Sequence, residues 1–174
     1  FSATLSPGHY HADLLGLPRD WQWLEVQSPF SAEQLRVQAL ANLSTRYQHR
    51  ETSLAPITDL MARQFHQQPG NYLAFFSSYA YLEQALDNFR RAHPDIPVWA
   101  QSRSMNEAER QDFLERFTEH SRGVGFAVLG GAFGEGIDLP GKRLIGAFIA
   151  TLGLPQVNPV NEEVKARMQQ MFGN

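Results

Sequence analysis

From about residue 56 onward, short continuous apolar runs alternate with longer stretches in which apolar residues recur at helical spacing. The apolar runs predict buried strands at residues 71–77, 96–100, 126–129 and 144–152. The helical spacing predicts helices at residues 56–68, 78–93, 105–117 and 161–171. Buried strands separated by helices favour a mostly parallel sheet with helices on both faces. The predicted fold class is therefore α/β, a three-layer sandwich.

The first third of the chain has a weaker pattern. It predicts the end of a strand at Phe1–Ser6, a short helix around His11–Leu15 and a short alternating strand at Trp23–Gln27. Ser31 opens a sequence typical of a helix cap. Residues 35–43 fit either a helix or an extended segment, and the pattern does not separate the two.

Composition narrows the class of protein. The 174 residues, 43% of them hydrophobic, are enough for one domain with a real core and short for two. A net charge of −3 argues against a generally basic nucleic-acid-binding surface, although it allows a local basic strip. The absence of cysteine excludes disulfides, thiolate metal sites and a cysteine nucleophile. With no membrane-length apolar run and no signal peptide, we expect a soluble cytoplasmic protein, cut from a longer chain because it does not begin with Met.

The stretch Val124–Gly141 combines a predicted strand with a glycine turn that contains two acids. The glycines are Gly130, Gly131, Gly134 and Gly136, and the acids are Glu135 and Asp138. Glycine lets the backbone turn sharply and a ligand approach closely, so α/β folds place binding sites at such turns. The stretch also fits the phosphate-loop spacing G-x-x-x-x-G-K, but Arg143 replaces the required Ser or Thr and Pro140 removes a backbone amide. We therefore reject a phosphate-binding loop here.

The residues that follow each predicted strand should form one rim, because parallel sheets bind ligands at the carboxyl ends of their strands. These residues are Ser2–Thr4, Ser77–Tyr79, Gln101 with Arg103, and the loop from Gly130 to Asp138. Their hydroxyls, amides and carboxylates suit an oxygen-rich ligand such as a phosphate, a ribose or a nucleic-acid backbone. Taken singly, each serine or glycine is more often a helix cap or a turn residue.

Several residues can be interpreted either as functional groups or as ordinary structural or solvated residues. Glu135 and Asp138 are a candidate acid–base pair, but without a neighbouring histidine or nucleophile they are better explained as solvated acids or a switch that senses a neighbour. His9 and His11 would bind a metal only with further ligands, so we predict turn residues and no metal site. Four arginines are candidates for phosphate contacts, or more often for a solvated face: Arg46, Arg50, Arg90 and Arg91.

Three segments together resemble one family. Phe1–Leu5 is similar to motif III, Asn71–Glu83 to motif IV and Gly130–Gly141 to motif V of the XPD/DinG-like DNA helicases of superfamily 2. Their order and spacing are those of the second RecA-like motor domain, and the resemblance covers nearly all of residues 1–174. It implies a RecA-like sandwich and an ATP-dependent DNA helicase that moves 5′ to 3′ on single-stranded DNA.

The resemblance also implies roles for individual residues. Residues along the single-stranded DNA track would be Ser77, Ser78, Tyr79 and Gly131. Residues that couple ATP hydrolysis to the strand would be Ser2 and Thr4. Residues at the ATP cleft would be Gly134 and Gly136, with the catalytic candidates Glu135 and Asp138. The loop from Gly131 to Gly136 would offer backbone amides to phosphates.

The resemblance further implies a partner domain. ATP and Mg²⁺ would be held mainly by a first RecA-like domain of the same parent chain, because this sequence has no complete phosphate-binding loop and no D-E-x-H segment. We expect the arginine-containing motif VI to lie outside this chain as well, so that the isolated chain is inactive. The alternative is a free-standing α/β nucleotide- or protein-binding module. A small Rossmann-like enzyme is less favoured, because no G-x-G-x-x-G follows the first strand.

Overall fold

The computed structural model of the chain describes residues 6–134, 136–151 and 158–172. The chain divides into two compact units, Phe1–Ala39 and Leu40–Asn174. The candidates Ser2, Thr4 and Glu135 lie outside the described residues, as does nearly all of the strand predicted at Phe1–Ser6.

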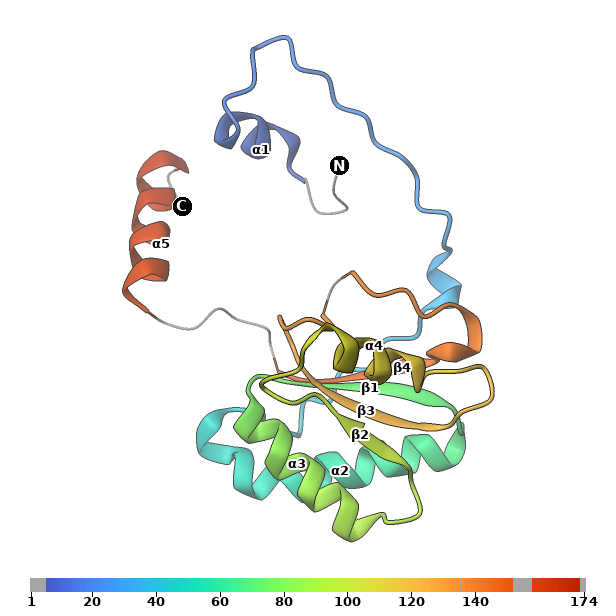
Figure 1. The fold of residues 1–174 in the computed structure, drawn as a ribbon. Helices are drawn as coiled ribbons and strands as arrows, with labels where there is room; N and C mark the ends of the chain where they lie inside the picture. The colour runs from blue at the N-terminus through green and yellow to red at the C-terminus, as the bar shows by residue number, and fades with distance from the viewer. Residues whose placement is uncertain (1–5, 135, 152–157, 173–174) are drawn as a thin grey trace. The chain divides into compact units, whose positions relative to one another are not determined.

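In its described residues, 6–39, the first unit contains one α-helix and little other regular structure (Figure 1). α1 spans Gly8–Leu14, and a 3₁₀ turn, η1, spans Ala32–Gln34. The predicted cap at Ser31 is confirmed, since its N–H donates to the Gln34 side-chain oxygen at 2.7 Å, although only a 3₁₀ turn follows. α1 confirms the predicted short helix and is followed by Gly16, whose φ of 63° favours glycine.

The strand predicted at Trp23–Gln27 is wrong. These residues pair with no strand in the part of the chain that the structure describes, and Leu24 is 82% exposed. Alternation of apolar and polar residues indicates an extended backbone, but a strand also needs a hydrogen-bonding partner. Residues 35–43 are likewise in neither a helix nor a strand.

The second unit contains all four predicted strands and all four predicted helices, with shifted ends. The strands are β1 (Asn71–Phe76), β2 (Val98–Ala100), β3 (Gly123–Val128) and β4 (Gly146–Ala150). The α-helices are α2 (Arg50–Gln67), α3 (Tyr79–Ala92), α4 (Glu107–Glu115) and α5 (Pro159–Phe172). Two 3₁₀ turns are η2 (Tyr47–His49) and η3 (Gly141–Arg143). In the described residues, no helix is long and apolar enough to cross a membrane.

The four strands form one parallel sheet in the order β2-β3-β1-β4. β1 lies in the interior of the sheet, where Asn71 pairs with Gly123 of β3 and Tyr72 pairs with Gly146 of β4. All six residues of β1 are buried, as expected for a strand that is covered on both faces. The predicted α/β class with a parallel sheet is confirmed.

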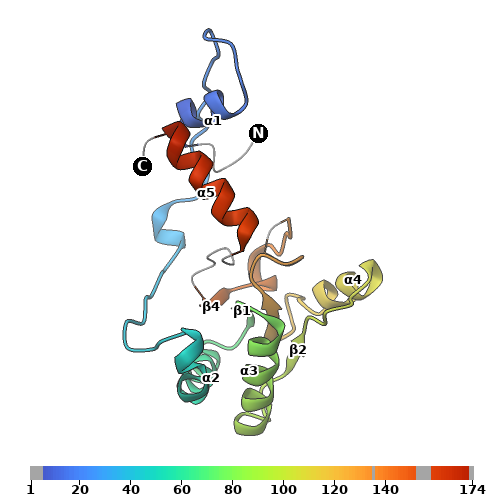
Figure 2. The same cartoon turned by 90° about the vertical axis from the view of Figure 1, so that its left-hand side faces the viewer.

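Helices cover both faces of the sheet (Figures 1 and 2). On one face, side chains of α2 and α3 pack on alternate residues of β1 and β3, where the Phe76 and Phe126 rings stack with centroids 5.6 Å apart. On the other face, Phe113 of α4 and the nearby Phe117 pack against Trp99 of β2. This arrangement is the three-layer RecA-like sandwich that the sequence predicted.

Two element boundaries differ from the prediction for identifiable reasons. α2 begins at Arg50, so Pro56 lies inside the helix rather than at its start. Because proline favours the first turn of helices, the sequence pattern placed this start too late. β3 begins at Gly123, ahead of the apolar run. A Cβ on its residue Gly125 would lie 2.7 Å from the Phe117 ring, so the strand needs glycine where the pattern expects an apolar side chain.

Candidate functional site

The carboxyl ends of three neighbouring strands meet at one edge of the sheet. The Leu129 N–H donates to the carbonyl of Phe76 at the end of β1, at 2.9 Å, and the Gln101 N–H donates to the carbonyl of Phe126 in β3, at 2.8 Å. We call the residues at this edge, Ser77–Tyr79, Gln101 and Val128–Gly131, the carboxyl rim. The structure thus brings together three of the four segments predicted to form a rim, the fourth being Ser2–Thr4.

The side chain of Gln101 joins the parts of the carboxyl rim. Its Nε2 donates to the Tyr79 hydroxyl and its Oε1 accepts from the Val128 N–H, each at 2.9 Å. Gln101 is only 7% exposed, and both ends of its amide are satisfied. Tyr79 is therefore fixed relative to the end of β3. The guanidinium carbon of Arg103 also lies over the Tyr79 ring, 5.1 Å from its centroid.

The glycine loop after β3 turns tightly at the rim. The Gly131 N–H donates to the Val128 carbonyl at 3.1 Å, and the Gly134 N–H donates to the Gly131 carbonyl at 3.0 Å. These two amides, predicted to face phosphates, are therefore occupied within the loop. A Cβ on Gly131 would lie 3.1 Å from the Val128 carbonyl and 3.4 Å from Gln101, so this glycine allows close packing of the loop on the rim.

Phe133 attaches the glycine loop to the body of the domain. Its side chain is 1% exposed, and its ring stacks on Phe113 of α4 with centroids 4.3 Å apart. Phe133 was not among the residues predicted for the site. A large apolar residue between glycines of a predicted binding loop was the signal that could have identified the anchor.

The two serines of the rim have different local roles. Ser78 is the N-cap of α3, where its hydroxyl accepts the Tyr81 N–H at 3.3 Å, as its predicted position at the helix start requires. The Ser77 hydroxyl instead accepts a hydrogen bond from Arg50 Nη2 at 2.7 Å. Ser77 therefore links the rim to the first residue of α2.

Arg50 differs from the other three candidate arginines. Its guanidinium carbon lies 4.6 Å from the Tyr81 ring centroid and 5.2 Å from that of Tyr47, whereas Arg46, Arg90 and Arg91 are exposed. Burial raises the pKa of the Tyr81 phenol, and the Arg50 charge acts in the opposite direction. This cluster was not predicted, because the sequence pattern placed the start of the helix at Pro56, after Arg50.

Asp138 and Gly136 lie in the exposed part of the loop. Asp138 makes no hydrogen bond or ion pair with another described residue, and Gly136 has a φ of 73°. The following turn, η3, leads into β4, and the Lys142 carbonyl lies 3.5 Å from the Asn71 side-chain nitrogen at the amino end of β1. A phosphate-binding loop instead joins a strand end to a helix, so the geometry supports rejecting that motif.

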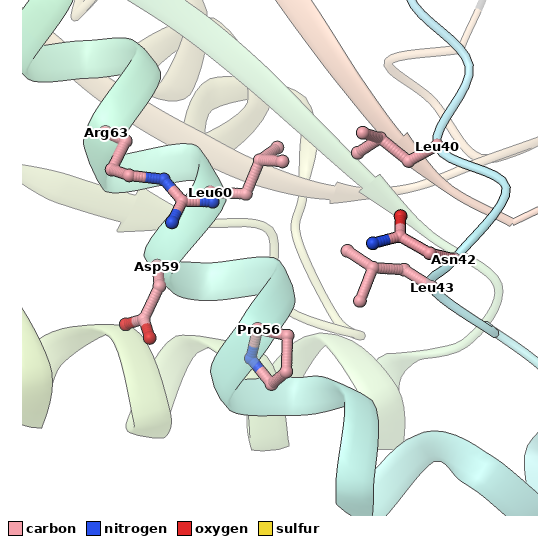
Figure 3. Close-up of a pocket in the computed structure, with 7 residues that line it drawn as sticks. All are labelled: Leu40, Asn42, Leu43, Pro56, Asp59, Leu60 and Arg63. Atoms are coloured by element: carbon pink, nitrogen blue, oxygen red, sulfur yellow. The ribbon is translucent and has the colours of Figure 1, made fainter.

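A shallow hollow lies elsewhere on the second unit, between residues 40–43 and α2 (Figure 3). Its lining residues are Leu40, Asn42, Leu43, Pro56, Asp59, Leu60 and Arg63. None of them belongs to the carboxyl rim, and the hollow has no convergent set of buried polar groups. Within the described residues, no three His, Asp or Glu side chains are grouped so that they could hold a metal ion.

Comparison with known proteins identifies the fold's family. A family model described as the helicase C-terminal domain matches residues 61–174, which include the whole sheet and the carboxyl rim. The chain belongs to this helicase C-terminal domain family. The resemblance seen in the sequence, to the C-terminal motor domain of superfamily 2 helicases of the XPD/DinG type, is thereby confirmed.

One relative matches this helicase C-terminal domain over almost all of the 174 residues. It is a protein from Methanocaldococcus jannaschii described as a probable ATP-dependent helicase, 27% identical over 179 residues that cover 98% of the chain. The chain spans 26% of the length of that relative.

Proposed function

We propose that this helicase C-terminal domain is the second motor domain of an ATP-dependent DNA helicase and holds single-stranded DNA at its carboxyl rim. The observation that carries the proposal is the joining of Ser77–Tyr79 to the glycine loop through Gln101, at the sheet edge where parallel folds bind ligands. The family match and the archaeal relative support a motor rather than a free-standing binding module.

Side chains of the rim suit a single strand. The half-buried Tyr79 ring would stack on a base, and the hydroxyls of Ser77 and Ser78 would donate to backbone oxygens, because each retains its O–H. Gly131, which lets the loop pack closely on the rim, would lie beside the strand. Movement from 5′ to 3′ follows from the resemblance to XPD/DinG-like enzymes.

ATP and Mg²⁺ would lie between this domain and a first RecA-like domain of the parent protein. The loop from Gly134 to Asp138 would form one wall of the cleft. The exposed Asp138 carboxylate would face the nucleotide or the arginines of the cleft. Such a wall fits one side of a nucleotide site and does not form a complete one, so the phosphate-binding loop and most metal ligands would come from the first domain.

The first prediction concerns Tyr79. We expect Tyr79→Ala to weaken binding of a labelled oligo-dT strand to the 174-residue chain by about tenfold, because stacking contributes roughly 1–3 kcal/mol per base. Tyr79→Phe is the matched control: it keeps the ring, loses the hydroxyl that Gln101 contacts, and should bind nearly as well as the wild type. Fluorescence anisotropy at low and moderate salt measures both.

Amide chemical shifts of the same chain locate the binding site. Addition of the strand should move signals of Ser77–Tyr79 and of the loop from Gly130 to Asp138, and these shifts should fade as salt rises. Shifts confined to other surfaces, or equal losses for Tyr79→Phe and Tyr79→Ala, would contradict strand binding at the rim. No binding at all would favour the binding-module alternative.

The second prediction concerns the loop acids in the parent helicase. Asp138→Ala and Glu135→Ala should each lower DNA-stimulated ATP hydrolysis at least tenfold, because a charge at the nucleotide cleft acts in a poorly screened environment. Glu119→Ala is a suitable control, since Glu119 is exposed and lies in the turn before β3. Wild-type hydrolysis by both loop variants would remove these acids from the ATP cleft.

A further inference from the structure

The guanidinium of Arg50 has a positive charge without a matching anion. It uses one N–H, on Nη2, for the Ser77 hydroxyl at 2.7 Å, and its buried Nε has no hydrogen-bond partner among the described residues. In that same part of the chain no carboxylate lies within ion-pair distance of Arg50, whereas Arg103, Arg110 and Arg167 each have one. Donors on its two terminal nitrogens are therefore available to a ligand.

The position of this charge is unfavourable for the isolated domain. Arg50 is the first residue of α2, where the helix dipole disfavours a cation, and it is only partly exposed to water. Two aromatic faces compensate in part, since Tyr81 and Tyr47 lie 4.6 and 5.2 Å from its guanidinium carbon. The buried Tyr81 ring and the hydrogen bond to Ser77 orient the guanidinium beside the rim without neutralising it.

A phosphodiester has the complementary chemistry. A planar guanidinium binds phosphate oxygens through paired N–H donors, and an already immobilised guanidinium loses little side-chain freedom when it does so. The shared hydrogen bond places Arg50 next to Ser77, a residue of the rim at which we have proposed strand binding. An exposed arginine such as Arg90 has neither the aromatic contacts nor the link to the rim.

We propose that Arg50 and Ser77 together bind one backbone phosphate of the single strand, with Arg50 supplying the charge. This inference rests on the proposed strand-binding function and adds a specific phosphate site to it. Arg50 is thereby a binding residue of the helicase domain, rather than part of a solvated face.

The salt dependence of strand binding tests this assignment. Each phosphate neutralised on a single strand contributes about 0.7 to the slope of log affinity against log salt concentration. We expect Arg50→Gln to weaken oligo-dT binding by the 174-residue chain about tenfold at low salt and to reduce the slope by about 0.7. Arg50→Lys should keep the slope while losing part of the affinity, because it retains the charge but not the planar fork.

Two matched variants separate a phosphate contact from other effects. Arg90→Gln removes the same charge from an exposed site, and its affinity and slope should stay close to those of the wild type. Ser77→Ala removes a hydrogen bond without changing charge, so it should lower affinity and leave the slope unchanged. The urea midpoint of each variant verifies folding, and Arg50→Lys provides the readout if Arg50→Gln is unfolded.

Four other results would each contradict the assignment of Arg50 and Ser77 to a backbone phosphate. Lower affinity of Arg50→Gln with the wild-type slope would make Arg50 a positioning residue for Ser77 only. An equal loss of slope in Arg90→Gln would indicate a general charge effect. If, in the parent helicase, Arg50→Gln lost binding of ATP with Mg²⁺ but kept strand binding, the phosphate would belong to the nucleotide. Absence of strand binding by the wild type would instead refute the proposed function itself.

Discussion

Among the acids that the structure describes, Asp95 is the one whose pKa is clearly lowered by the fold. Its Oδ2 lies 2.9 Å from His66 Nε2, which joins the turn before β2 to the last turn of α2. This hydrogen bond, more than the backbone or nearby charges, holds the pKa of Asp95 below its ordinary value of 3.8. The ionised carboxylate therefore favours the folded state.

A pH-dependent contribution to stability follows from this shift. A depressed carboxyl pKa stabilises the fold above the ordinary value, and the contribution is lost as pH falls through the lower, folded pKa. We expect Asp95→Ala to lower the urea midpoint at pH 5 and to lower it less at pH 2.5. Asp87→Ala, at an exposed position on α3, is the control. A midpoint difference that does not depend on pH would contradict this role for Asp95.

Single residues of the site were predictable to different degrees from sequence. Ser77 to Tyr79 were predictable because they directly follow a continuous apolar run, and such runs end where parallel sheets bind ligands. Arg50 was one of four arginines predicted as candidates for phosphate contacts. The sequence could not distinguish it from the other three, because its two tyrosine contacts and its hydrogen bond to Ser77 form only on folding. Gln101 was predicted as a rim residue, but its two hydrogen bonds depend on the register of β2 and β3.

At the scale of elements, the loop after β3 has, among its described residues, one fully buried side chain, Phe133, together with partly buried ones such as Ile137 and Leu139 that pack on the same cluster. Its glycines allow the turn, but they supply no side chains for packing, so the stacking of Phe133 on Phe113 holds the loop near α4. A loop held in this way keeps its glycines at the carboxyl rim at little cost in conformational freedom when a ligand binds.

Removal of this anchor should be costly. We expect Phe133→Ala to lower the free energy of unfolding by about 3 kcal/mol, as for other buried phenylalanines. Phe133→Leu keeps most of the apolar volume and should lose less than half as much. Urea unfolding followed by circular dichroism measures both values. If Phe133→Ala matched the wild type, the loop would not be packed on α4 in solution.

Element type was more predictable than element ends. The four apolar runs gave four strands, because a strand covered on both faces needs apolar residues throughout. The start of β3 was missed, since close packing against Phe117 and Trp99 requires glycine there. The false strand at Trp23–Gln27 has the opposite cause, because its local pattern is suitable but it lacks a partner strand among the described residues.

For the whole molecule, nearly all of the buried apolar residues belong to the second unit, and Ala12 is the exception among the described residues. Among the described residues, both hydrophobic clusters of the sandwich draw all their members from position 43 onward. The first unit contributes none of these side chains, and several of its large apolar residues, including Val26 and Phe30, are exposed.

A shortened chain tests this division. We expect residues 40–174 to unfold cooperatively in urea, with an unfolding free energy within about 15% of that of the 174-residue chain, close to the error of the extrapolation. Phe126→Ala in the long chain is the destabilised reference, and it should lose about 3–5 kcal/mol from the core. A loss of similar size on removal of residues 1–39 would show that the first unit supports the core.

The order of the strands in the sheet could not be predicted from the sequence. Apolar runs predict that strands exist, but the order β2-β3-β1-β4 depends on pairings between residues far apart in the chain. None of these pairs is a hairpin with a recognisable turn, since every ladder in the sheet is parallel.

The same strand pairing has a consequence for folding during synthesis. β1 is synthesised before both of its partner strands. Asn71 cannot pair until Gly123 of β3 has been made, and Tyr72 cannot pair until Gly146 of β4 has been made. During synthesis, the apolar residues of β1 therefore stay without strand partners until most of the domain has left the ribosome, sheltered only by α2 and α3. Closing such long loops is slow, so chaperone demand should be greatest in the interval between the emergence of β1 and that of β4.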